Sequence, residues 1–179
     1  MIKTNAAKIG FLLLCCLGVI GMAQDLAEPP DHGCYYRGAS GWQKLEPILP
    51  SGTKVRGFSG MTQIYRETNA PMQLSDRRPI FYIKTTPDKQ SLMESTLRSM
   101  VIVRLEQKKD HRELQVIKSG LIGAKVEIDK KRMPDITVHA VNSMLLTITP
   151  NEDLSDGEYL ITYDSLARLG YDFGITAKK

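Results

Sequence analysis

The sequence contains few cysteines and histidines, and their scarcity excludes several kinds of site. Of three cysteines among 179 residues, Cys15 and Cys16 lie together in an apolar N-terminal run, so the rest of the chain has only Cys34. A single thiol cannot form an internal disulfide, so the core must stabilise the fold, and we expect Cys34 to be buried. The histidines are His32, His111 and His139. They are too far apart in sequence to form the closely spaced pairs of zinc sites.

Charge of one sign is not in large excess. The formal net charge of the whole chain is +4. Lys3 and Lys8 belong to a segment that we expect to be removed, and no acidic residue precedes Asp25, so subtracting 2 from +4 leaves about +2. Nucleic-acid binding requires a strongly basic face, so this balance predicts no nucleic-acid partner.

Long apolar runs are also rare, and the main one is Phe11–Ile20. A membrane-spanning helix needs about 20 apolar residues, so this run is too short to cross a bilayer. Basic residues precede it, and Gly21-Met22-Ala23 follows it with small residues at both key positions, which is the layout of a secretory signal peptide. We predict a signal peptide over 1–23 and an exported protein, periplasmic or extracellular, without a transmembrane segment after cleavage. Lipid attachment at Cys15 or Cys16 remains an alternative.

The remaining chain divides into three predicted parts. Residues 24–32 are polar and contain two adjacent prolines, which predicts a flexible leader. Residues 33–65 contain two short aromatic-bearing runs around a glycine-flanked turn, which predicts an N-terminal β-hairpin followed by a glycine-rich loop over 51–60. Residues 66–179 are predicted to form a β-sandwich domain, and we expect Trp42 of the hairpin to lie outside it.

Strand patterns recur from Met61 onward with turn signals between them. The predicted strands are 62–65, 79–85, 100–105, 114–117, 136–141, 145–149, 159–163 and 171–176. Residues 88–98 have helical spacing and predict one short helix or a long loop, and 119–123 predict a loop. This pattern predicts an all-β, immunoglobulin-like β-sandwich with an N-terminal β-hairpin and at most one short helix.

One motif carries the likeness to immunoglobulin-like domains. Leu146-Thr147-Ile148 followed by Leu154-Ser155-Asp156-Gly157-Glu158-Tyr159 resembles their tyrosine corner, in which a tyrosine hydroxyl bonds back to the preceding loop. The resemblance implies structural roles for Gly157 and Tyr159. Position 161 is isoleucine rather than cysteine, so the antibody-type disulfide is missing. The order of motifs, closing with Tyr171-Asp172-Phe173-Gly174-Ile175, is also similar to secreted bacterial β-sandwich proteins of unknown function, which implies export but no site residues.

Three patterns could carry a binding function. The acidic stretch 151–158 could bind calcium, but its glycine and ligand spacing differ from a calcium loop, so a solvated connection is favoured. The basic clusters 108–112 and 130–132 could bind an anionic glycan or a membrane surface, or could simply keep the sheet soluble. The aromatic residues Tyr35, Tyr36 and Trp42 form a possible binding surface, with packing of the hairpin as the simpler interpretation.

No catalytic residue, metal ligand or cofactor is predicted. We expect a non-enzymatic binding or structural module of the cell envelope, whose partner is a protein or a glycan. One alternative is a secreted hydrolase using carboxylates that only the fold brings together, such as Asp156, Glu158 and Asp172. Another is an assembly subunit that pairs through an edge strand.

Overall fold

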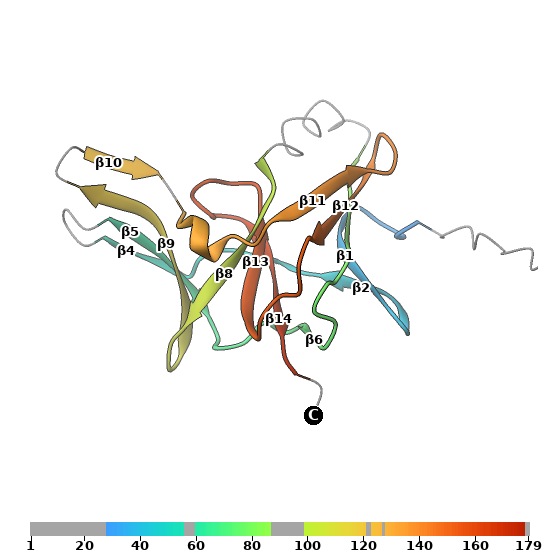
Figure 1. Cartoon of the computed structure of the whole chain (residues 1–179), viewed down its shortest axis with the longest axis horizontal. Coiled ribbons are helices and arrows are strands. Elements are labelled where there is room, and N and C mark those ends of the chain that lie inside the picture. The colour runs from blue at the N-terminus through green and yellow to red at the C-terminus, as the bar shows by residue number, and fades with distance from the viewer. Residues whose placement is uncertain (1–27, 56–59, 87–98, 121–122, 127, 178–179) are drawn as a thin grey trace, which may run out of the picture.

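The architecture comes from a computed structural model that describes residues 28–55, 60–86, 99–120, 123–126 and 128–177 (Figure 1). In these residues the chain forms antiparallel sheets that curl around a packed interior, together with the short 3-10 helix η3 (Lys130–Arg132). The predicted all-β sandwich is confirmed. Within the described ranges, no helix has the length and apolar character needed to span a membrane.

The smaller sheet has five strands, all antiparallel to their neighbours. Their order is β11 (Ile136–Ala140), β12 (Leu145–Pro150), β7 (Phe81–Lys84), β1 (Gly33–Gly38) and β2 (Gly41–Leu45). The predicted hairpin is therefore formed by β1 and β2, but β1 also pairs with β7, so the hairpin is part of the sandwich. Trp42 lies in β2, and its predicted place outside the sandwich is wrong.

The larger sheet has nine strands. Seven follow one path, in the order β3 (Pro47–Ile48), β14 (Gly170–Ile175), β13 (Gly157–Thr162), β8 (Val101–Gln107), β9 (His111–Gly120), β5 (Met61–Arg66) and β4 (Gly52–Val55). Off this path, β10 (Gly123–Val126) pairs with β9, and β6 (Gln73–Leu74) pairs in parallel with β14. Figure 1 shows the β4, β5, β9 and β10 end extending away from the smaller sheet.

Two of these strands lie where the sequence predicted loops. β4 falls within the predicted loop 51–60, and β10 begins inside the predicted loop 119–123. β4 is an edge strand whose residues are mostly exposed, so its sequence lacks the alternation that marks a half-buried strand. Its pairing with β5 comes from backbone hydrogen bonding, which side-chain patterns do not report.

The core has two parts, one on each face of the strands at the centre of the larger sheet. Successive residues of a strand point to opposite faces. Thus Tyr159 and Ile161 of β13 pack toward the smaller sheet, whereas Leu160 packs on the other side. Between the sheets lie Cys34, Leu45, Phe81, Ile83, Ile102, Leu146, Ile148, Phe173 and Ile175. The second cluster contains Tyr65, Val103, Leu105, Leu114, Val116 and Ala167.

The passage from β12 to β13 carries the chain from the smaller to the larger sheet, and Tyr159 holds its end. The Tyr159 hydroxyl donates to the Ser155 carbonyl at 2.7 Å, and the ring stacks on Phe173 with centroids 5.4 Å apart. Gly157 has φ +151°, and a Cβ there would lie 3.0 Å from Nε of Arg104. The backbone conformation therefore favours glycine at position 157, and any other residue would also require the Arg104 guanidinium to shift.

Several predicted features lie at the margins of the described chain. The signal peptide 1–23 and the helix or loop over 88–98 fall outside the described residues. Of the leader 24–32, Glu28 and Pro29 contact the smaller sheet: Nζ of Lys84 donates to the Pro29 carbonyl at 2.8 Å and lies 3.1 Å from the Glu28 carboxylate. This end of the leader is therefore attached to the sheet.

Candidate functional site

The fold brings together two of the three carboxylates named from the sequence. Glu158 in β13 and Asp172 in β14 both contact the guanidinium of Arg112 in β9. Asp156 lies apart, where its carboxylate pairs with the side chain of Arg77 at 2.5 Å and is more than half exposed. Because Asp156 and Glu158 have separate partners, the acidic stretch 151–158 does not converge on one point as a calcium loop would.

The ionic triad Glu158–Arg112–Asp172 is buried. Arg112 Nη1 lies 2.7 Å from Oδ2 of Asp172 and 3.5 Å from Oε2 of Glu158. The three residues are only 2 to 4% exposed. The remaining guanidinium nitrogens of Arg112 donate to the backbone carbonyls of Glu67 and Arg66 at 3.1 and 3.0 Å. The Arg112 side chain therefore bonds to β13, to β14 and to the end of β5. The triad thus links these three parts of the larger sheet.

Glu158 is enclosed on all sides by donors. The backbone N–H of Ala70 donates to Oε2 at 2.6 Å, and the Gln73 side-chain amide donates to Oε1 at 3.0 Å. Both oxygens therefore have partners besides Arg112. The Gln73 amide also occupies the space in front of Gly174, where a Cβ would lie 2.1 Å from it. Gly174 is needed for this packing, which in turn holds Glu158.

Arg112 was not predicted as a site residue and was named only as part of the basic cluster 108–112. The signal that could have found it is the period-two pattern of β9. Arg112, Leu114 and Val116 are all buried, and the residues between them are half-buried. Extending that alternation back by one step from Leu114 places Arg112 on the buried face, where a charge requires a carboxylate partner.

Two grooves meet at the exposed side of the triad. Both are bordered by Ile48, Pro71 and Asp172. The first, which we call the Asp172 groove, has a volume of about 410 Å³ and is also bordered by Leu45, Glu46 and Met72. The second has a volume of about 340 Å³ and is bordered by Arg66, Glu67 and Arg112. Asp172 is the member of the triad that borders both grooves.

The aromatic residues predicted as a binding surface separate onto two faces of the smaller sheet. Tyr36 packs toward the core against Phe81, with ring centroids 6.2 Å apart, so it is not part of an outer surface. Tyr35 and Trp42 lie on the outer face with Tyr82, which the sequence analysis did not name. Trp42 makes edge contacts with both tyrosine rings, at 6.2 Å to Tyr35 and 4.8 Å to Tyr82.

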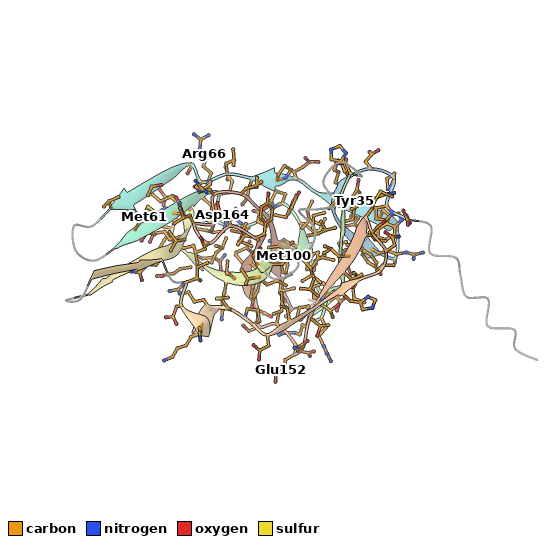
Figure 2. The ribbon with its side chains drawn as sticks, turned by 90° about the horizontal axis from the view of Figure 1, so that it is seen from above. Tyr35, Met61, Arg66, Met100, Glu152 and Asp164 are labelled. Atoms are coloured by element: carbon orange, nitrogen blue, oxygen red, sulfur yellow. The ribbon has the colours of Figure 1, made fainter. Side chains whose placement is uncertain are left out.

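Cationic side chains cover these outer rings. The guanidinium carbon of Arg37 lies 5.3 Å from the Trp42 ring centroid, and Nζ of Lys44 lies 5.9 Å from that of Tyr35. We call Tyr35, Arg37, Trp42, Lys44 and Tyr82 the aromatic face. Figure 2 shows that Tyr35 lies at the opposite end of the molecule from Met61. The aromatic face is thus remote from the extended β5–β9 end.

Two polar atoms of the aromatic face are buried without hydrogen-bond partners. They are the Tyr35 hydroxyl oxygen and Nη1 of Arg37, and both residues contact the Trp42 ring. Buried polar atoms in folded proteins nearly always have a partner, either from the protein or from ordered water. Arginine can only donate and a tyrosine hydroxyl can donate, so an acceptor is the kind of group that could bond to both.

The two basic clusters meet around Glu106 in β8. The side chains of Lys108 and Arg132 both contact its carboxylate, the latter at 3.0 Å. Next to them, Glu113 accepts from Lys54 at 2.6 Å and lies 2.9 Å from Nε2 of His111. These hydrogen bonds lower the pKa of Glu113 from 4.5 to about 2, and the bond from Lys54 has the largest effect. These basic side chains are thus largely engaged by neighbouring carboxylates.

Comparisons with known proteins give no assignment. No protein-family model matches this sequence, and no significant match was found among curated proteins or solved structures. In the described ranges, no group of three or more histidine, cysteine, aspartate or glutamate residues is arranged to hold a metal ion.

Proposed function

We propose that this protein is a non-enzymatic binding module of the cell envelope that takes an anionic glycan on its aromatic face. The observation that carries the proposal is the pair of buried, unpartnered polar atoms beside Trp42, the Tyr35 hydroxyl and Arg37 Nη1. Both atoms are buried, so the side chains of the aromatic face must shift for the carboxylate, sulfate or phosphate oxygens of a glycan to accept from them. Aromatic rings add contact area to such a site at little cost in conformational entropy.

The charges on the outer face of the smaller sheet support an anionic ligand. Residues that pair directly across antiparallel strands share a face. Tyr35 pairs with Lys44 and with Tyr82, and Arg37 pairs with Trp42, so two cations and three rings share this face. Lys84 lies further along the same face, with its ammonium bonded to Glu28 and Pro29.

A hydrolase has less support from the geometry. A glycosidase needs two carboxylates that reach the substrate, one as acid and the other as base or nucleophile. Glu158 is 2% exposed, and both its oxygens are occupied by donors from Ala70, Gln73 and Arg112. Such a carboxylate is a structural group. One observation supports the alternative of assembly through an edge strand. Val55, on edge strand β4, is an apolar residue that is 71% exposed.

Trp42 is the single tryptophan in the sequence, so its fluorescence reports directly on the aromatic face. We expect alginate oligomers, which carry carboxylates, to change the Trp42 emission in a saturable way. Dextran oligomers, which are neutral, should leave it unchanged. The response to alginate should weaken as salt is raised, because salt screens the attraction between charges.

Matched variants localise the binding. Arg37→Gln should weaken alginate binding at least threefold, since it removes a charged donor beside the ring. Lys130→Gln removes the same charge from η3, away from the aromatic face, and should leave the affinity unchanged. Equal loss in both variants would mean unspecific attraction between charges. An absent response to alginate would refute the proposal.

A further inference from the structure

We propose that the Asp172 groove binds a small organic cation, an ammonium group on a short apolar stem, with Asp172 as its counter-ion. This site is separate from the aromatic face and does not depend on the function proposed there. It rests on an unbalanced buried charge, on the carboxylates that border the groove and on the apolar residues between them.

The ionic triad carries an unbalanced formal charge. Two carboxylates, Glu158 and Asp172, meet one guanidinium, that of Arg112, so their formal charges sum to −1. Within the described chain, no second cation contacts either carboxylate. An uncompensated charge in a low-dielectric interior is costly, and a cation placed beside it would relieve that cost. The triad therefore favours a cationic ligand at any opening that reaches it.

That opening is at Asp172. Arg112 contacts only Oδ2 of Asp172, and Asp172 borders the Asp172 groove although it is only 4% exposed. Glu158, by contrast, has donors on both oxygens and does not border the groove. Asp172 is therefore the carboxylate of the triad that remains able to accept from a ligand.

The rest of the groove suits an ammonium on an apolar stem. Glu46 is exposed and adds a second carboxylate at the rim. Lys44 also borders the groove, but its ammonium lies over the ring of Tyr35 on the outer face of the sheet. Ile48 and Met72 provide apolar walls next to these charges. A volume of about 410 Å³ lies within the range of small-ligand sites, about 300 to 1,000 Å³.

A matched pair of probes separates charge from shape. Nuclear magnetic resonance titration of the full chain with n-butylammonium should give saturable amide shifts centred on Ile48, Gln73 and Asp172. n-Butanol has the same apolar stem and no charge, so it should bind at least tenfold more weakly. Equal shifts with the two probes, or shifts with butylammonium that are scattered over the surface, would overturn the proposal.

Variants test the roles of the two carboxylates. Asp172→Asn should weaken butylammonium binding at least tenfold, but it alters a buried triad and could unfold the protein. Glu46→Gln changes only an exposed rim residue and should weaken binding about threefold. Glu152→Gln is the matched control on an exposed loop away from the groove and should have no effect. Butylammonium affinity that is the same in Glu46→Gln as in Glu152→Gln would contradict a cation site at this groove.

Discussion

The Arg112 side chain links three strands of the larger sheet, although the local sequence pattern marks it only as part of a basic cluster. Its guanidinium bonds to carbonyls at the end of β5 and to carboxylates on β13 and β14. The bonds to the carboxylates are buried and those to the carbonyls are part-buried, so the protein rather than water satisfies most of the charge. Removing the guanidinium would leave Glu158 and Asp172 close together with no cation between them.

We predict that Arg112→Met lowers the free energy of unfolding by about 3 to 5 kcal/mol, the usual cost of leaving a buried charge unpaired. Urea denaturation of the purified protein measures the change. The triple variant Arg112→Met, Glu158→Gln and Asp172→Asn should regain part of the loss, because it removes the carboxylate charges as well. A triple variant less stable than Arg112→Met alone would show that the carboxylates do not depend on Arg112.

We predict that Tyr159→Phe lowers the free energy of unfolding by about 1 kcal/mol, since the Ser155 carbonyl loses its donor while the ring remains packed. The matched control is Tyr163→Phe, where the ring is 42% exposed and little change is expected. Thermal or urea unfolding compares the two variants. Equal effects would mean that the hydroxyl bond at the corner contributes nothing to stability.

Among the elements, the end of the β8–β9 hairpin is where stability should depend on pH. Donation from Lys54 and then His111 lowers the pKa of Glu113 from 4.5 to about 2. Its stabilising contribution is therefore complete above pH 4.5 and is lost as pH falls toward about 2. Hydrogen bonds to Glu113 and Asp110 raise the pKa of His111 above 6.5, so its contribution is complete below pH 6.5 and is lost as pH rises through the raised pKa.

We predict that Glu113→Gln destabilises the protein most between pH 4.5 and 6.5, where both contributions are complete. The difference in urea midpoint between the parent protein and the variant should shrink as pH falls from 4.5 toward 2. It should also shrink above the raised pKa of His111. Glu152→Gln serves as the control and should give a difference that does not vary with pH. A constant difference for Glu113→Gln would show that this contact is not coupled to protonation.

The strength of the sequence signal differed from element to element. β8 and β12 were found because their apolar residues form dense or alternating patterns, which burial requires. β4 and β10 were missed, since neither carries an alternating apolar pattern and the backbone of a neighbouring strand supplies their pairing. The pairing of β1 with β7 is a contact between segments far apart in sequence, and no local pattern encodes it.

The candidate sites show the same division. Glu158 and Asp172 were named as carboxylates that the fold could bring together, but their shared partner Arg112 was not. Tyr35 and Trp42 were named as a surface, whereas Tyr82, which comes from another strand of the same face, was not. The sequence therefore indicated which residue types could form a site. Which of them lie together depends on the order of strands in the sheets, which the sequence did not predict.

At the scale of the whole molecule, the interior between the sheets is packed without a disulfide in the part of the chain that the structure describes. Cys34 is fully buried there beside residues from both sheets, and burial raises the pKa of its thiol. We predict that Cys34 reacts with iodoacetamide only when the protein unfolds, at the rate of global unfolding. Peptide mapping after labelling measures this. Ser40→Cys in the exposed turn between β1 and β2 is the control and should react at once. Rapid labelling of Cys34 would mean that the two layers separate locally.

The order of strands has a consequence for biosynthesis. The smaller sheet combines strands from residues 33–45 with strands from 81–150, and β14, at residues 170–175, lies inside the larger sheet between β13 and β3. A ribosome must therefore translate β12 before the smaller sheet can close and β14 before the larger sheet can close. Until then the nascent chain exposes unpaired strand edges. Chaperones bind such edges, and without chaperones the edges favour aggregation.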